Sequence, residues 1–201
     1  MGRTLIDYGH EQDRVNQTAV ALRSFREAVP VLETQVRDQP SVAMWQRELA
    51  DGYQGLGTTL ESAGLPAQAL QSVEKALTLR RALVRDHPTV ISYQVLLAVD
   101  ISVVGLLLDQ VGQPTAALRS QQEALAIWDT RLRHRSSDQG SQAWRADTIN
   151  WIAGLQYKLG RTAEAIRSYE QARDVIRKLV RDDPQVIRYR QALIMPTSAA
   201  R

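Results

Sequence analysis

The chain has 201 residues, of which 44% are hydrophobic, and it carries a formal net charge of +3 at pH 7. It contains no cysteine, which excludes disulfides and thiolate metal sites. Its basic residues are 22 Arg and 3 Lys, interleaved with Asp and Glu nearly everywhere except in one patch at Arg131, Arg133, His134 and Arg135. Because this interleaving leaves no continuous basic stripe along the chain, we disfavour nucleic acid as a partner.

The sequence repeats itself every 48 residues without insertion or deletion. Gly64, Gly112 and Gly160 obey this spacing. So do the alanines at 21, 69, 117 and 165 and the arginines at 37, 85, 133 and 181. A fixed period of this size is typical of stacked supersecondary units that bury their apolar faces against one another. We therefore predict an all-α solenoid of antiparallel helix pairs, in about four repeats.

The first repeat covers residues 2–40. Its opening stretch, Arg3 to Val15, is less apolar than the equivalent stretches of the later repeats, which suits a helix that caps the array. Asn16 stands where the later repeats have their turn glycine. Because Asn tolerates a left-handed backbone better than most residues, we predict the same turn there.

The second repeat, residues 41–88, shows the design most clearly. Ser41 is a candidate N-cap, and apolar residues then recur at spacings of three and four as far as Leu60, which predicts an amphipathic helix. Gly64 suits the helix end, and Pro66 suits the first turn of a second helix that closes at Pro88. The short connection between the two helices predicts an antiparallel hairpin.

The third repeat, residues 89–136, opens with the longest apolar run of the chain, Val90 to Leu108. Asp100 lies near its centre, and inserting such a residue into a bilayer costs ~3 kcal/mol. The run is also in register with the soluble stretch from Val42 to Leu60. We therefore predict a buried repeat helix and no membrane contact.

The fourth repeat covers residues 137–184, and it follows a junction that breaks the pattern. Ser136 replaces the closing proline, so the stretch from Ser136 to Ser141 predicts a looser loop. A partial helix is expected at residues 185–193 and a disordered tail at 194–201. The apolar end that this partial repeat would leave is a possible surface for self-association.

The motif of these repeats resembles the tetratricopeptide repeat. The resemblance rests on Tyr53, the pair Leu56 and Gly57, Leu60 and Gly64, followed by Ala69, Val73 and Ala76. The family period is about 34 residues, so each helix here would be seven residues longer, close to two turns. The resemblance implies a right-handed superhelix whose first helices line a concave groove. The long form also resembles repeat tails of bacterial, planctomycete-type serine/threonine kinases.

In that family the groove binds peptides, and a clamp of Lys, Asn and Arg holds a C-terminal carboxylate. The clamp is not reproduced here, since Asp51, Asp109 and Asp147 would repel an anionic terminus. The resemblance places the partner-binding groove at Gln54, Thr58, Val99, Ser102, Val103, Leu106, Asn150, Trp151, Tyr157 and Lys158.

Two interpretations of that groove stay open. Val99, Val103 and Leu106 give the third first-helix a second apolar face, which together with Trp151 and Tyr157 predicts a patch for an extended or helical peptide. Alternatively, the long helices pack more tightly and fill the groove themselves.

No catalytic motif, phosphate loop or metal-ligand spacing occurs, so we predict no catalytic residue, no cofactor and no metal. The function expected is a cytoplasmic scaffold that binds a protein or peptide. The alternatives are a self-associating or intramolecular regulatory module of a larger signalling protein and, third, an RNA-binding helical repeat.

Overall fold

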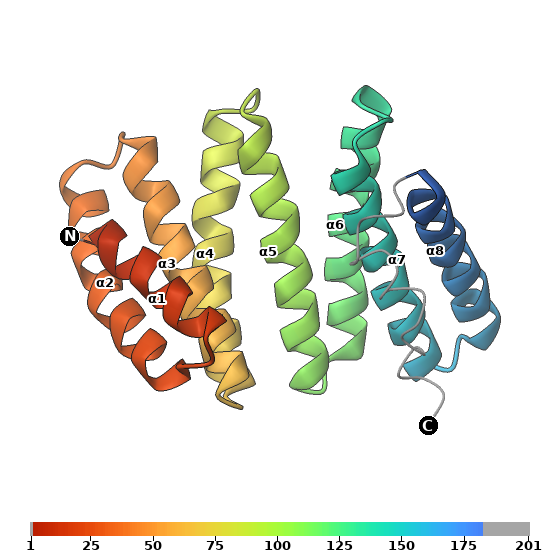
Figure 1. The fold of residues 1–201 in the computed structure, drawn as a ribbon, viewed down its shortest axis with the longest axis horizontal. Coiled ribbons are helices and arrows are strands. Elements are labelled where there is room, and N and C mark those ends of the chain that lie inside the picture. Colours follow the sequence, from red (N-terminus) through yellow and green to blue (C-terminus); the bar gives the residue numbers. More distant parts are fainter. Residues whose placement is uncertain (1, 183–201) are drawn as a thin grey trace. The chain divides into compact units, whose positions relative to one another are not determined.

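The computed structural model describes residues 2–182, which consist of α-helices joined by short turns and contain no strand (Figure 1). Each repeat contributes a first helix with an odd number and a second helix with an even number. The helices are α1 (Gly2–Arg14), α2 (Thr18–Asp38), α3 (Ala43–Ser62), α4 (Pro66–Asp86), α5 (Ile91–Gln110), α6 (Pro114–His134), α7 (Gln139–Lys158) and α8 (Thr162–Asp182).

The helix boundaries keep the 48-residue period. The second helices begin at Thr18, Pro66, Pro114 and Thr162, and successive starts are 48 residues apart. The first helices α3, α5 and α7 begin at positions 43, 91 and 139, with the same step. The predicted succession of helix pairs in register is therefore confirmed.

The turn inside each repeat reverses the chain through one residue with positive φ. Gly64, Gly112 and Gly160 have φ of 76°, 80° and 76°. Asn16 takes their place in the first repeat, with φ of 58°. The turn predicted from Asn16 is confirmed, because its side chain tolerates the left-handed region that most residues avoid.

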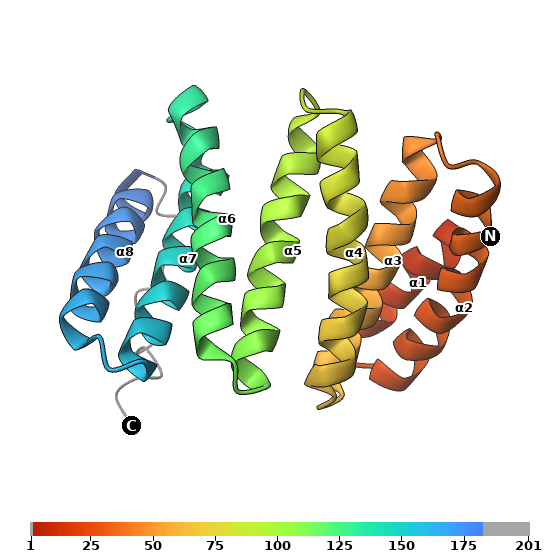
Figure 2. The ribbon, with the colours of Figure 1, turned by 180° about the vertical axis from the view of Figure 1, so that it is seen from behind.

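The chain divides into two compact units, residues 1–111 and residues 112–201, so the third repeat contributes one helix to each. In unit 1, each helix from α1 to α5 packs against the next, and α1 also contacts α3. Figure 2 brings α2 and α4 to the front of this unit, so first and second helices form two layers. In unit 2, α7 packs between α6 and α8.

The core of unit 1 is built from apolar side chains of both helix types. One buried cluster gathers around Phe25, Leu32 and Tyr53, and another around Val73 and Leu107. Small residues permit the close approach within each pair. A Cβ added at Gly57 would overlap Val73, and one at Gly9 would lie 2.9 Å from the Phe25 ring. These positions carry the glycines of the repeat motif because a larger side chain would push the paired helices apart.

Two local predictions at the starts of first helices were wrong. Ser41 does not cap α3, which begins at Ala43 after Val42 and has no side-chain cap. The expected loose loop after Ser136 is a tight turn, because Asp138 caps α7 and accepts a hydrogen bond from the Ser141 amide at 3.2 Å.

A side-chain hydrogen bond that the sequence did not predict recurs at the junctions before α3, α5 and α7. A glutamine early in the first helix donates to the carbonyl oxygen six residues before it, which holds the connecting turn against the helix. The pairs are Gln46 with Pro40 at 2.6 Å, Gln94 with Pro88 at 2.7 Å and Gln142 with Ser136.

Among the described residues, one helix, α5, is long and apolar enough to cross a membrane by length and composition alone. A core helix of a soluble protein passes the same test. α5 packs against α4, and its Asp100 is buried in an ion pair with Arg80 of that helix. These contacts favour the interpretation of α5 as a buried repeat helix.

Residues 183–201 lie outside the part of the chain that the structure describes. The predicted partial helix at 185–193, the predicted disordered tail at 194–201 and the self-association surface that they would form fall there. Those three, and the proposed limits of the repeat domain, stay predictions.

Candidate functional site

The predicted groove residues of α3 have limited capacity to contact a partner. Gln54 and Thr58 are half-buried. The Thr58 hydroxyl donates within its own helix, and the carbonyl oxygens of Gln54 and Gly55 lie 3.2 and 3.1 Å from it. This hydroxyl is therefore engaged by the backbone of α3.

The predicted groove residues of α5 are partly used for packing. Val99, Ser102, Val103 and Leu106 are all half-buried. Val103 packs against the buried cluster that includes Val73. Val103 therefore contributes to packing within unit 1, and both interpretations of the groove stay predictions.

The predicted groove residues of α7 are exposed. Trp151 is 45% exposed and Tyr157 49% exposed, and Asn150 and Lys158 are exposed as well. Gly154 lies between the two aromatic positions, about 60° from each around the helix axis. A Cβ at Gly154 would meet only the Tyr169 hydroxyl, at 3.5 Å. The surface of α7 thus presents two exposed aromatic side chains, with Gly154 between them and the Tyr169 hydroxyl of α8 close to that glycine.

A buried ion network in unit 1 was missed by the sequence argument. Arg80 of α4 is 1% exposed, and its Nε donates to Asp100 Oδ2 of α5 at 3.0 Å. Its Nη2 donates to Asp51 Oδ1 of α3 at 2.5 Å, and its Nη1 is buried without a partner among the described residues. Asp51 is partly exposed, so the network reaches from the core of unit 1 toward its first-helix side.

The electrostatics of this network are dominated by burial. Asp100 is 1% exposed, and desolvation raises its pKa to about 6. The charge and hydrogen bond of Arg80 oppose that rise, and the nearby charge of Asp51 adds to it. Two carboxylates, Asp51 of α3 and Asp100 of α5, therefore share the one guanidinium of Arg80 on α4, and Asp100 is the carboxylate less able to hold its charge.

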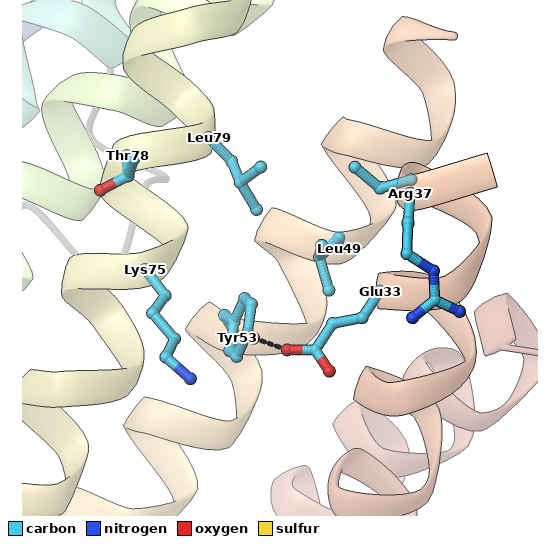
Figure 3. Close-up of a pocket in the computed structure, with 8 residues that line it drawn as sticks. Glu33, Arg37, Leu49, Tyr53, Lys75, Thr78 and Leu79 are labelled. Atoms are coloured by element: carbon cyan, nitrogen blue, oxygen red, sulfur yellow. Dashed lines mark hydrogen bonds between the residues drawn. The ribbon is translucent and has the colours of Figure 1, made fainter. Parts of the chain in front are cut away.

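A hollow of about 350 Å³ opens between the second helices α2 and α4, with α3 as its floor (Figure 3). Leu49 and Tyr53 of α3 lie nearly opposite Gln54 and Thr58 around that helix, since each residue turns it by about 100°. The hollow therefore faces away from the predicted groove. Its lining residues are Glu33, Val36, Arg37, Leu49, Tyr53, Lys75, Thr78 and Leu79.

Tyr53 is the central polar group of this hollow. Its hydroxyl donates a short hydrogen bond to the Glu33 carboxylate, and Lys75 Nζ lies 5.0 Å from the centre of its ring. Burial raises the pKa of Tyr53 above its ordinary value, and the bond to Glu33 raises it further. Tyr53 therefore stays protonated, as a donor that positions Glu33.

Unit 2 has its own polar and aromatic contacts between α6 and α7. The rings of Trp128 and Trp144 stack with centroids 6.2 Å apart. Arg131, a member of the basic patch noted in the sequence, is half-buried and donates to Asp138 and Ser141. Since this guanidinium helps to hold the turn before α7, less of the patch is free for phosphate.

Across residues 2–182, no group of three or more His, Asp or Glu side chains is placed to hold a metal ion. The predicted groove residues divide between the two units, with Gln54, Thr58 and the α5 set in unit 1 and the α7 set in unit 2. Each set is a surface of its own unit.

Comparison with protein families matches residues 49–89 to the tetratricopeptide repeat. No curated protein matches the chain. Among the crystal structures similar to this chain, the apo form of RapI has a TM-score of 0.69 at 11% identity, and BtubC (BKLC) from P. vanneervenii has a TM-score of 0.66 at 15% identity.

The RapI match covers 98% of this chain and 64% of the other, and the BtubC match covers 84% and 60%. The chain thus spans less than two thirds of the length of either protein. At these identities the likeness shows the fold alone. Together with the family match, it confirms an α-solenoid of about four tetratricopeptide-like repeats.

Proposed function

We propose that this protein is a scaffold without catalytic activity, which binds a protein or peptide partner on the first-helix side of its repeats. The tetratricopeptide match at residues 49–89 and the helical-repeat fold support this general role. A repeat array gives each helix pair a similar outward face, which suits an extended contact better than an enclosed reaction site.

The surface of α7 is the observation that carries the proposal. Trp151 and Tyr157 are large and exposed, with the small residue Gly154 between them, and Asn150 and Lys158 are exposed on the same helix. Aromatic side chains with few rotatable bonds are common anchors of protein interfaces. We assign the main partner contact to this helix.

The setting we propose is the cytoplasm of a bacterium, where the repeats serve a larger signalling protein. This part rests on the resemblance of the long repeat to kinase tails and on nothing else. Regulation within such a protein would use the same first-helix surface, occupied in turn by a partner and by a segment of the protein itself.

The experiment is affinity capture from the source cells with wild type and with the Trp151→Ala/Tyr157→Ala variant. We expect the double variant to lose the partners that wild type enriches, because each truncation of an interface anchor costs about 2 kcal/mol or more. Since both side chains are exposed, circular dichroism should show an unchanged helical content.

Ile166→Ala is the matched control. Ile166 is an apolar side chain 53% exposed on the second helix α8, so its loss removes a similar surface from the other helix type. Capture should survive this change. Equal recovery of the same partners by wild type and by the double variant would refute the assignment to α7.

A further inference from the structure

The hollow on the second-helix side of unit 1 has the features of a binding site distinct from the α7 surface. Its apolar lining consists of Leu49 and the ring of Tyr53 on the α3 floor, with Leu79 of α4 beside them (Figure 3), and Val36 of α2. Its volume of about 350 Å³ lies at the small end of the range for ligand sites. This is room for one bulky apolar side chain, not for a folded domain.

The rim carries opposite charges on its two sides. Lys75 stands on the α4 side, and no ion pair of its ammonium exists within the described residues. Glu33 stands on the α2 side, where the Tyr53 hydroxyl holds its carboxylate. Arg37 also lines the hollow on the α2 side, where it pairs with Asp38 at 3.6 Å. Glu33 and Lys75 are the two rim charges in direct contact with Tyr53, one through its hydroxyl and the other over its ring.

The packing of these repeats does not by itself create the hollow. In unit 2 the equivalent positions, 96 residues later, hold Asp129 for Glu33 and Arg145 for Leu49. Arg145 Nε donates to Asp129 Oδ1 at 2.5 Å, and both side chains are only partly exposed. An internal ion pair thus occupies the place that is an apolar floor in unit 1.

We propose that this hollow binds an extended peptide segment of a partner protein that carries an acidic, a bulky apolar and a basic residue at alternate positions. Alternate side chains of an extended chain point to the same side, about 7 Å apart. The apolar side chain lies on Leu49 and Leu79, the acidic one meets Lys75 and the basic one meets Glu33.

The apolar contact and the two charged contacts contribute differently to peptide binding. Burial of the apolar side chain supplies most of the affinity, since it removes a leucine-sized surface from water. The exposed charges contribute little affinity each but decide which segment fits and in which direction it lies. This site is independent of the α7 surface and can exist whether or not α7 binds a partner.

The test uses the full chain with labelled methyl groups and two synthetic peptides, followed by NMR titration. The first peptide is acetyl-Gly-Glu-Ser-Leu-Ser-Lys-Gly-amide, and the second has Lys in place of its Glu. Wild type should bind the first peptide about threefold more tightly, with shifts at the methyls of Val36, Leu49 and Leu79. Replacing the peptide leucine with serine should weaken binding about tenfold.

Reversing the charge at position 75 distinguishes loss of specific peptide binding from loss of folding. Lys75→Glu should prefer the second peptide, so the order of the two affinities inverts in a protein that is still folded. Gln171→Glu, at the equivalent position of unit 2, should leave the order unchanged. The double variant Glu33→Asp/Leu49→Arg copies the ion pair of unit 2 into the hollow and should abolish binding of both peptides.

Three results would overturn the proposal: no methyl shift at millimolar peptide, shifts that lie outside the hollow, or the same peptide preference in Lys75→Glu as in wild type. The Trp151→Ala/Tyr157→Ala variant should bind both peptides as wild type does. Failure of the α7 assignment and failure of this site are therefore distinguishable.

Discussion

At the scale of single residues, Arg80 departs most clearly from the repeat. The positions 48 residues before and after it hold Leu32 and Trp128, and Ile176 follows at the next step, all of them buried and apolar. Arg80 occupies the same buried position with a charge. The folded protein can hold this charge because Asp100 and Asp51 pair with it: a buried charge without a partner lowers the free energy of unfolding strongly, whereas a paired one changes it little.

We expect Arg80→Leu to lower the free energy of unfolding by about 3 kcal/mol, since it leaves Asp100 buried without a cation. The double variant Arg80→Leu/Asp100→Thr should recover most of that loss, because both new residues occur at equivalent positions of other repeats. Urea unfolding followed by circular dichroism measures both. A single variant as stable as wild type would show that the network contributes nothing.

The same network predicts how stability responds to pH. The pKa of Asp100 is about 6 in the folded protein and about 4 in an unfolded chain, so the folded state binds the extra proton between these values. Its contribution to stability is thus complete below about pH 4 and is lost as the pH rises through about 6.

Asp100→Asn removes this titration, so the difference in unfolding free energy between wild type and variant should change between pH 4 and pH 6. One proton gives a slope of at most about 1.4 kcal/mol per pH unit. Urea titrations at several pH values test this, and a difference that is constant across the window would contradict the assignment to Asp100.

At the scale of the helix, the period predicted most of what was found. Helix boundaries, turn glycines and the conformation of Asn16 depend on local residues that recur every 48 positions, so four copies reinforce each prediction. Ser41 failed as a cap because Gln46 holds the same turn from within the helix. The residue preferences used to predict helix caps describe the residues at the helix end, so they do not reveal a hydrogen bond from a side chain inside the helix to a carbonyl six residues earlier.

The turns allow a direct test of backbone cost. Nothing lies within 4 Å of a Cβ placed on Gly64, so Gly64→Ala adds only the penalty of positive φ, about 1 kcal/mol. Gly64→Asn should cost less, since Asn16 already adopts this conformation. Thermal unfolding of the two variants gives the order, and an alanine variant as stable as the asparagine variant would refute the argument.

At the scale of the whole molecule, the candidate sites lie where repeats differ, and that limits what a period can predict. The hollow requires Leu49 where unit 2 has Arg145, and the ion network requires Arg80 where the other repeats are apolar. The motif could place Trp151 and Tyr157 on a first helix. It could not show that Val103 would be used in packing while the α7 side chains stay exposed.

The division into units predicts which fragment of the chain folds alone. The two core clusters around Phe25 and Val73, and the network of Arg80, Asp51 and Asp100, use residues of unit 1 only. A fragment of residues 1–111 should therefore be helical and unfold cooperatively. A fragment of residues 1–88 lacks α5, so the buried Val104 and Leu107 no longer pack on the Val73 cluster, and the unfolding free energy should be lower by at least about 3 kcal/mol, since each buried side chain of this size contributes roughly 1.5–3 kcal/mol. Circular dichroism with urea compares the two, and equal stability would mean that α5 is not part of the unit 1 core.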